Sequence, residues 1–196
     1  MASFHSNAHF FTSDNHQIHQ ITYSPPATFV TEVHQANIVK NMSPQQTHDF
    51  AISFLSSEIK IQPNELQVNN HYVDVWDHFY FDHIVNDKPV KNHAASLMVK
   101  DGTVLSYSYN FQDKPKLKKC TGEISETKAL ENAKEHVKGC SVDESRGIEH
   151  VYLDTKDGLV PAYWFQMNNC KDDKMLQVGV DACSGEVIYL FNYFVN

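Results

Sequence analysis

Arginine is almost missing from this chain of 196 residues, because Arg146 is the only one. Aspartate and glutamate together number 24 against 16 lysines and arginines, which gives a formal net charge of −8. Proteins that bind nucleic acids use basic patches and arginine forks to hold phosphates, so we expect no nucleic-acid partner. A partner with a basic surface would suit this composition better.

Long apolar runs are also missing, since none approaches the roughly 20 residues of a membrane-spanning helix. The first residues show no basic start followed by an apolar stretch, so no signal peptide is visible. The chain has no Gly-x-Ser-x-Gly motif and no CxxC spacing, so neither a serine nucleophile nor a zinc site is indicated. We therefore expect no membrane segment, no cofactor and no enzyme.

The first half predicts one helix followed by an antiparallel sheet. Residues 1–25 are polar and rich in histidine, which is typical of an extended arm without its own core. Ser43, Pro44 and Gln46 form the pattern of a capped helix start. Asp101-Gly102 between two alternating runs predicts a hairpin turn. The expected strands are 67–75, 79–85, 93–99 and 104–111.

The second half repeats this order after a lysine-rich linker at 112–121. A helix is expected from its cap at Ser125 through Val137, and Gly139 is expected to end it. The strands that follow are predicted at 150–154, 160–168, 174–180 and 186–194. The sequence thus predicts an α+β protein of two consecutive units, each with a helix packed on an antiparallel sheet.

Several short segments resemble the propeptide region of fungalysin- and thermolysin-like metallopeptidases. In the first unit these are PATF at 26–29, AISFL at 51–55, YFDHIVNDKPV at 80–90 and VKDGTVLSY at 99–107. In the second unit PAYWF at 161–165 and VDACSGEVI at 180–188 resemble a PepSY domain. The resemblance implies a fungalysin/thermolysin propeptide-like domain at 26–111 and a PepSY-like domain at 122–196, both with cystatin-like folds.

The catalytic part of such peptidases is not found in this sequence. Their HExxH helix binds zinc through two histidines and uses the glutamate as general base. Glu135-His136 and Glu149-His150 both lack the second histidine, and the chain ends about where the family's catalytic domain would begin. We therefore expect no metal site.

The resemblance implies a non-catalytic, prodomain-type inhibitor and folding assistant of a zinc metallopeptidase, acting in cis or in trans. Such a protein is expected in the secretory pathway, in a vacuole or outside the cell. An edge strand and the C-terminal tail would pair with the enzyme's cleft, so the expected contact residues are Tyr193, Phe194, Val195 and Asn196. The alternative function is a structural or storage protein that assembles with itself, with disulfides between chains.

Four cysteines lie in the second half, and their even number favours disulfides over buried thiols. A strand separates Cys170 from Cys183 and a helix separates Cys120 from Cys140, so neither of these pairs can bond. The strand directions predict Cys140–Cys170 and Cys120–Cys183. The crossed pairing stays open, because the loop at 141–147 is long enough to reverse the helix.

Other side chains suggest chemistry only weakly. The pairs His5/His9 and His16/His19 have a spacing that suits metal binding, but they lie in a segment without a helical pattern. Four histidines fall in the first predicted sheet, where we expect them at the strand surface with a pH switch as the alternative: His71, His78, His83 and His93. Asp172-Asp173 is expected in a solvated turn, and Trp76 and Trp164 are expected mostly in the core.

Overall fold

The helix α1 (Pro44–Ile59) begins with the capping box that the sequence predicts. The Gln46 N–H donates to Ser43 Oγ at 3.3 Å, and the Ser43 N–H donates to Gln46 Oε1 at 2.8 Å. Lys60 then turns into the left-handed conformation with φ of 61°, which ends the helix three residues before Pro63. A short 3₁₀ turn, η1 (Pro63–Glu65), leads into the first sheet.

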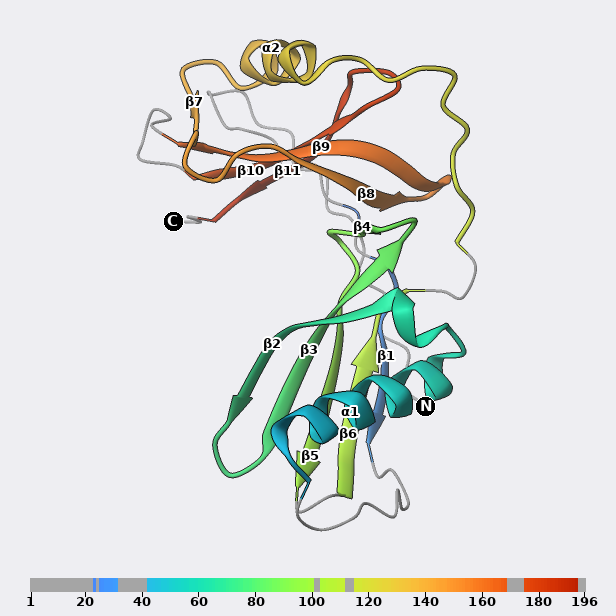
Figure 1. Ribbon diagram of the computed structural model, residues 1–196. Helices are drawn as coiled ribbons and strands as arrows, with labels where there is room; N and C mark the ends of the chain where they lie inside the picture. Colours follow the sequence, from blue (N-terminus) through green and yellow to red (C-terminus); the bar gives the residue numbers. More distant parts are fainter. Residues whose placement is uncertain are drawn as a thin grey trace. The chain divides into compact units, whose positions relative to one another are not determined.

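The computed structural model describes Tyr23 and residues 25–31, 42–100, 103–111, 115–168 and 175–193. Its residues form two compact units that meet in sequence between Pro115 and Lys116. Two antiparallel sheets and two α-helices lie in the described part of the chain, which makes the fold mixed α and β as predicted (Figure 1).

The sheet of the first unit has the strand order β1-β6-β5-β3-β2, and a short β4 adds to β3. All pairings are antiparallel. Lys100 pairs with Thr103 around the predicted Asp-Gly turn, which itself lies outside the described residues. The strands are β1 (Thr28–Thr31), β2 (Leu66–Val73), β3 (Asp77–Val85), β4 (Lys88–Pro89), β5 (Ala95–Lys100) and β6 (Thr103–Tyr109).

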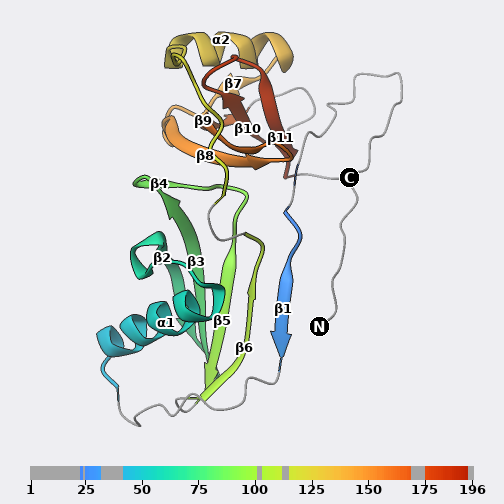
Figure 2. The ribbon, with the colours of Figure 1, turned by 90° about the vertical axis from the view of Figure 1, so that its right-hand side faces the viewer.

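Strand β1 was not predicted, although it runs along β6 at one edge of this sheet (Figure 2). The predicted strand 67–75 is shorter than expected and ends at Val73, because Asp74, Val75 and Trp76 form the connection to β3. At the opposite edge from β1, β2 pairs only with β3 among the described strands.

The core of the first unit lies between α1 and one face of this sheet. Ala51 and Leu55 of the helix are fully buried against Phe79 and Leu97 of the strands. The Tyr107 hydroxyl donates to Glu58 Oε2 at 2.8 Å and ties the helix to β6. Burial, together with this hydrogen bond to a carboxylate, raises the pKa of Tyr107 to about 12.

In the second unit, α2 (Glu126–His136) starts at its predicted cap, where the Lys128 N–H donates to Ser125 Oγ at 3.2 Å. The sheet has the order β11-β10-β9-β7, and β8 also pairs with β9. Its strands are β7 (Ser141–Val142), β8 (Glu149–Thr155), β9 (Gly158–Asn168), β10 (Leu176–Asp181) and β11 (Val187–Asn192). The predicted meander is present, and the two-residue β7 was not predicted.

The second core lies between α2 and one face of β9 and β10. Ala129 and Ala133 pack against Phe165, Met167 and Val178. A smaller cluster lies on the other face of the sheet, around Val151, Leu153, Ala162 and Trp164. Residues 116–118, predicted as linker, belong to this unit, because the Leu159 N–H donates to the Lys116 carbonyl and the Lys118 N–H to the Leu159 carbonyl.

Candidate functional site

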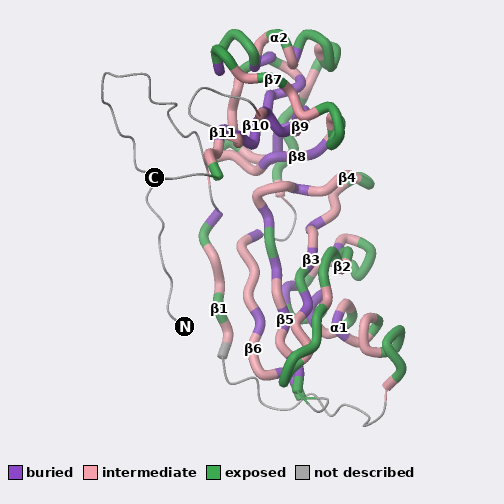
Figure 3. Tube along the Cα trace, turned by 90° about the vertical axis from the view of Figure 1, so that its left-hand side faces the viewer, coloured by how far each residue is buried: buried purple, intermediate pink, exposed green. Residues whose placement is uncertain are grey.

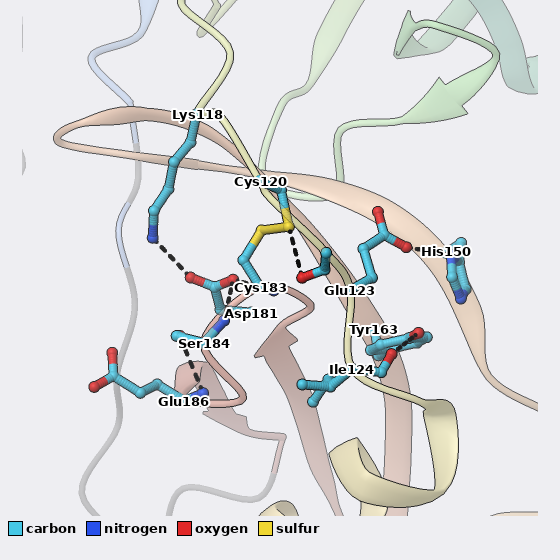
Figure 4. Close-up of a disulfide and its surroundings, with 11 residues drawn as sticks. Lys118, Cys120, Glu123, Ile124, His150, Tyr163, Asp181, Cys183, Ser184 and Glu186 are labelled. Atoms are coloured by element: carbon cyan, nitrogen blue, oxygen red, sulfur yellow. Dashed lines mark hydrogen bonds and ion pairs between the residues drawn. A yellow bond between two sulfur atoms is a disulfide. The ribbon is translucent and has the colours of Figure 1, made fainter.

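A disulfide joins Cys120 to Cys183, with the two Cα atoms 5.6 Å apart (Figure 4). It ties the segment before α2 to the turn between β10 and β11. The Ile124 N–H donates to the Ala182 carbonyl at 2.8 Å, so main-chain hydrogen bonds hold the same two segments together. This is one of the two pairings that the strand directions predict.

The second predicted pairing, Cys140–Cys170, involves a residue outside the described part of the chain. Cys140 is disulfide-bonded. Its neighbour Ser141 pairs with Asn168 at the end of β9. Cys140 therefore lies at the end of the sheet from which the chain continues towards Cys170.

Asp181 is a buried carboxylate beside the disulfide, and the sequence did not predict it. Its Oδ2 accepts a hydrogen bond from Lys118 Nζ at 2.8 Å, and its Oδ1 accepts from the Cys183 and Ser184 N–H groups at 2.7 and 3.1 Å (Figure 4). Burial acts to raise the pKa of Asp181, but these hydrogen bonds outweigh it and lower the pKa below its usual value. The carboxylate therefore stabilises the turn in its charged form.

The predicted partner-binding tail is described only at Tyr193, while Phe194, Val195 and Asn196 lie outside the described residues. Tyr193 is half exposed and directly follows β11, which forms one edge of the second sheet. Its N–H donates to the Met175 carbonyl at 3.0 Å, and its ring meets Phe191 edge to face. The sheet therefore fixes where the tail begins.

Two of the four histidines assigned to the strand surface are in fact buried. His83 and His93 are almost fully buried, with their Nδ1 atoms 2.8 Å apart and Phe111 stacked on His83. The surface interpretation is wrong for them, because His83 continues the alternation of Phe79 and Phe81 on the core side of β3. That alternation was the signal available in the sequence.

Trp76 was predicted to lie mostly in the core, but it is 37% exposed in the connection between β2 and β3. Four other large side chains of this hairpin are exposed with it: Tyr72, Val73, Val75 and Tyr80. Figure 3 shows the end of β2 and this connection as exposed. The prediction failed because Trp76 lies in the connection between β2 and β3 and not in a strand with one buried face. Trp164, in contrast, packs against the smaller cluster of the second unit.

His71 and His78 lie on opposite faces of the same hairpin. His78 stacks on Tyr72 with ring centroids 4.5 Å apart. His71 stacks on Phe79 at 4.1 Å, and its two ring nitrogens lie 3.0 Å from His48 Nε2 and from Asp77 Oδ1. Both histidines are partly buried, so the strand-surface prediction holds for them only in part.

No group of three or more metal-ligating side chains is found among the residues that the structure describes. The weak metal-binding pairs His5/His9 and His16/His19 and the turn with Asp172-Asp173 lie outside that part. A pocket beside Trp164, Gln166 and Gln177 has a volume of about 50 Å³. Pockets for organic ligands start near 300 Å³, so this one fits only a few atoms. No described helix is long and apolar enough to cross a membrane.

Comparisons with known proteins give little support for a function. A scan against known protein families finds no match, and no curated protein matches the sequence. Among solved structures, the C-terminal domain of YpeB from Bacillus megaterium is similar, with 16% identity and a TM-score of 0.43. The match covers 85% of this chain and 72% of that one. The resemblance to metallopeptidase propeptides remains a prediction.

Proposed function

We propose that this protein is a non-catalytic, prodomain-type inhibitor and folding assistant of a zinc metallopeptidase. The observation that carries the proposal is the edge strand β11 and its continuation into the half-exposed Tyr193. An extended segment at a sheet edge can enter a peptidase cleft and pair with it as an added strand.

The start of this segment is held in place before any partner binds. Strand β11 pairs with β10 from Leu176 to Val180, and the Tyr193 hydroxyl donates to Gln177 Oε1 at 3.4 Å. A partner therefore has less conformational freedom to remove on binding, which favours affinity. Main-chain pairing would supply affinity, while the Tyr193 ring would supply contact area.

The folding role follows from the same contact by mass action. A ligand that binds only the folded enzyme stabilises it in proportion to the logarithm of its concentration over its dissociation constant. The Cys120–Cys183 disulfide suits an oxidising compartment, which supports our proposal that the protein works in the secretory pathway, in a vacuole or outside the cell.

Self-assembly through disulfides between chains is the alternative that the sequence left open. Cys120 and Cys183 are joined within one chain, and Cys140 is also disulfide-bonded. The described cysteines therefore do not favour a covalent polymer, and we keep the inhibitor as our proposal.

Inhibition assays on thermolysin-type and fungalysin-type peptidases test this function. We expect the chain to lower the initial rate of peptide hydrolysis and to raise the refolding yield of the catalytic domain. Tyr193→Ala should weaken inhibition by about tenfold, as expected for an aromatic contact at an interface. Phe29→Ala is the matched control, because Phe29 is 53% exposed against 50% for Tyr193 but lies on β1 of the first unit.

Two outcomes would contradict the proposal. One is the absence of both inhibition and a gain in refolding yield with either class of peptidase. The other is hydrolysis of the test peptide by the chain alone.

A further inference from the structure

We propose that the end of the β2–β3 hairpin is a second docking surface, which takes a segment of a partner protein rich in lysine or arginine. The surface comprises Tyr72, Val73, Val75, Trp76 and Tyr80 together with Asp74. It lies in the first unit, whereas Tyr193 lies in the second, so it goes beyond the proposed function and can be tested apart from it.

The apolar part of this surface is unusually open for large side chains. Val75 is 74% exposed and Val73 is 65% exposed, beside the partly exposed Trp76. Single exposed apolar residues are normal, but a contiguous group that includes tryptophan and tyrosine is typical of interaction sites. Covering these side chains would remove apolar area from water and favour binding.

The connection between the two strands is fixed by its own hydrogen bonds. The Asp74 N–H donates to the Trp76 carbonyl at 3.0 Å, and the Trp76 N–H donates to Asp74 Oδ1 at 2.8 Å. His78 Nε2 lies 3.2 Å from the same oxygen and stacks on Tyr72. The tryptophan is therefore presented by an ordered turn, which lowers the entropy that binding would remove.

The other face of the hairpin is anchored to α1. His71 links His48 of the helix to Asp77 of β3, with both nitrogen contacts at 3.0 Å. Phe79, fully buried beneath this link, stacks on His71. The exposed side chains thus project from a hairpin that the core holds in place.

Charge decides which partner fits. The backbone N–H of Trp76 gives the largest contribution to lowering the pKa of Asp74, so this carboxylate stays negative well into the acid range. Asp77 lies on the opposite face of the hairpin, where its Oδ1 is 3.0 Å from His71 Nε2. Asp74 is therefore the charged group among the aromatic and apolar side chains of this surface, and a cationic partner complements it as well as the chain's net charge of −8.

A cationic segment satisfies both features of this surface. A guanidinium or ammonium group can lie over the ring of Trp76 or Tyr72 while it pairs with Asp74. A second copy of this chain fits less well, because each copy would bring the same carboxylate and a net charge of −8. Among the described strands, β2 lies at an edge of its sheet. From Asn70 onwards, after the register shift at Val68, it can also pair with an extended backbone.

Titration with two designed peptides tests this proposal. The probe is an acetylated, amidated Arg-Val-Arg-Val-Arg-Val peptide, and its counterpart carries glutamate in place of arginine. We expect the arginine peptide to bind, to change tryptophan fluorescence, and to bind more weakly as salt screens the charges. The glutamate peptide should not bind.

Single-residue variants locate the binding site and separate the contribution of the Asp74 charge from that of the Trp76 ring. Trp76→Ala should weaken binding about tenfold or more and remove most of the fluorescence change. Asp74→Asn keeps the oxygen that accepts from the Trp76 N–H but loses the charge, so it should weaken binding several-fold without loss of fold. Phe29→Ala, on β1, and Tyr193→Ala, in the second unit, should bind like the unaltered chain.

Three results would overturn the proposal. These are equal binding of the arginine and glutamate peptides, unchanged affinity in both Trp76→Ala and Asp74→Asn, and self-association that Trp76→Ala abolishes. The last would show that a second copy occupies the surface, and sedimentation of the unaltered chain and of the Trp76→Ala variant at rising concentration would reveal it. Circular dichroism of each variant checks that the fold is kept.

Discussion

A single buried residue, Asp181, holds the turn between β10 and β11 in place, although burying a charged group is unfavourable by itself. Asp181 is 1% exposed, yet three donors surround its carboxylate: Lys118 Nζ and two backbone N–H groups. A buried charge without such partners costs several kcal/mol. The same ion pair raises the pKa of Lys118, so both groups are charged in the folded chain.

Asp181 should make the second unit sensitive to acid. Its pKa is lower in the folded chain than the value near 3.9 of an unfolded aspartate, so its stabilisation is present above about pH 4 and is lost as the pH falls through the folded value. Asp181→Asn should lower the free energy of unfolding by about 2 kcal/mol at pH 7, the value of a charge-assisted hydrogen bond.

Urea unfolding of both proteins between pH 3 and pH 7 checks this. We expect the difference between them to shrink towards pH 3, because the carboxylate of the unfolded chain takes up a proton at a higher pH than that of the folded chain. A difference that is constant over this range would show that the charge of Asp181 does not stabilise the fold. Lys118→Met is a companion variant that removes only the ammonium donor.

Residue types alone were a poor guide to which side chains are buried. Trp76 was placed in the core as an aromatic residue of a strand, and His83 and His93 were placed at the strand surface. Burial instead follows the alternation along β3 and the point where β2 ends. Asp181 was missed because its three donors come from 118 and from 183 and 184, and only the folded chain brings these together.

At the scale of elements, local signals were sufficient for the helices and most strands. The caps at Ser43 and Ser125 are both confirmed, because capping depends on residues three positions apart. Strands β1, β4 and β7 were missed, since they have four, two and two residues and gain stability from pairing with β6, β3 and β9, not from their own sequence. Such short strands have no alternation to detect.

The contact between the segment at 116–118 and the start of β9 depends on Gly158. Its φ is 115°, and a Cβ there would collide with the carbonyl oxygen of Lys116, which accepts a hydrogen bond from the Leu159 N–H at 2.7 Å. Gly158→Ala should therefore destabilise the second unit by about 2 kcal/mol or more.

Thermal unfolding measures this effect against a matched control. Gly122→Ala introduces the same methyl group at a position with no atom within 4 Å and without a positive φ. We expect Gly122→Ala to leave the melting temperature nearly unchanged and Gly158→Ala to lower it by several degrees. Equal effects would contradict the packing of 116–118 against β9.

At the scale of the molecule, the Cys120–Cys183 bond closes a long loop around α2 and most of the second sheet, with a sequence separation of 63. The bond reduces the conformational freedom of the unfolded chain, which raises the free energy of unfolding by about 2–4 kcal/mol. Cys120→Ser with Cys183→Ser should lower the stability of the second unit by this amount, as followed by urea unfolding.

Peptide mapping without reduction gives the complementary test. We expect a peptide that joins Cys120 to Cys183 and a second that joins Cys140 to Cys170. Non-reducing electrophoresis should show a single band at the size of one chain. A ladder of larger species would favour self-assembly over the inhibitor.

We propose that this chain binds a zinc metallopeptidase without being an enzyme itself. Sedimentation velocity of a mixture with a zinc-loaded thermolysin-type catalytic domain, with hydrolysis of a reporter peptide followed in the same mixture, tests it most directly. We expect a one-to-one complex in which the peptidase is slowed and this chain stays intact. Two species that sediment independently at micromolar concentration, with the peptidase fully active, would contradict it.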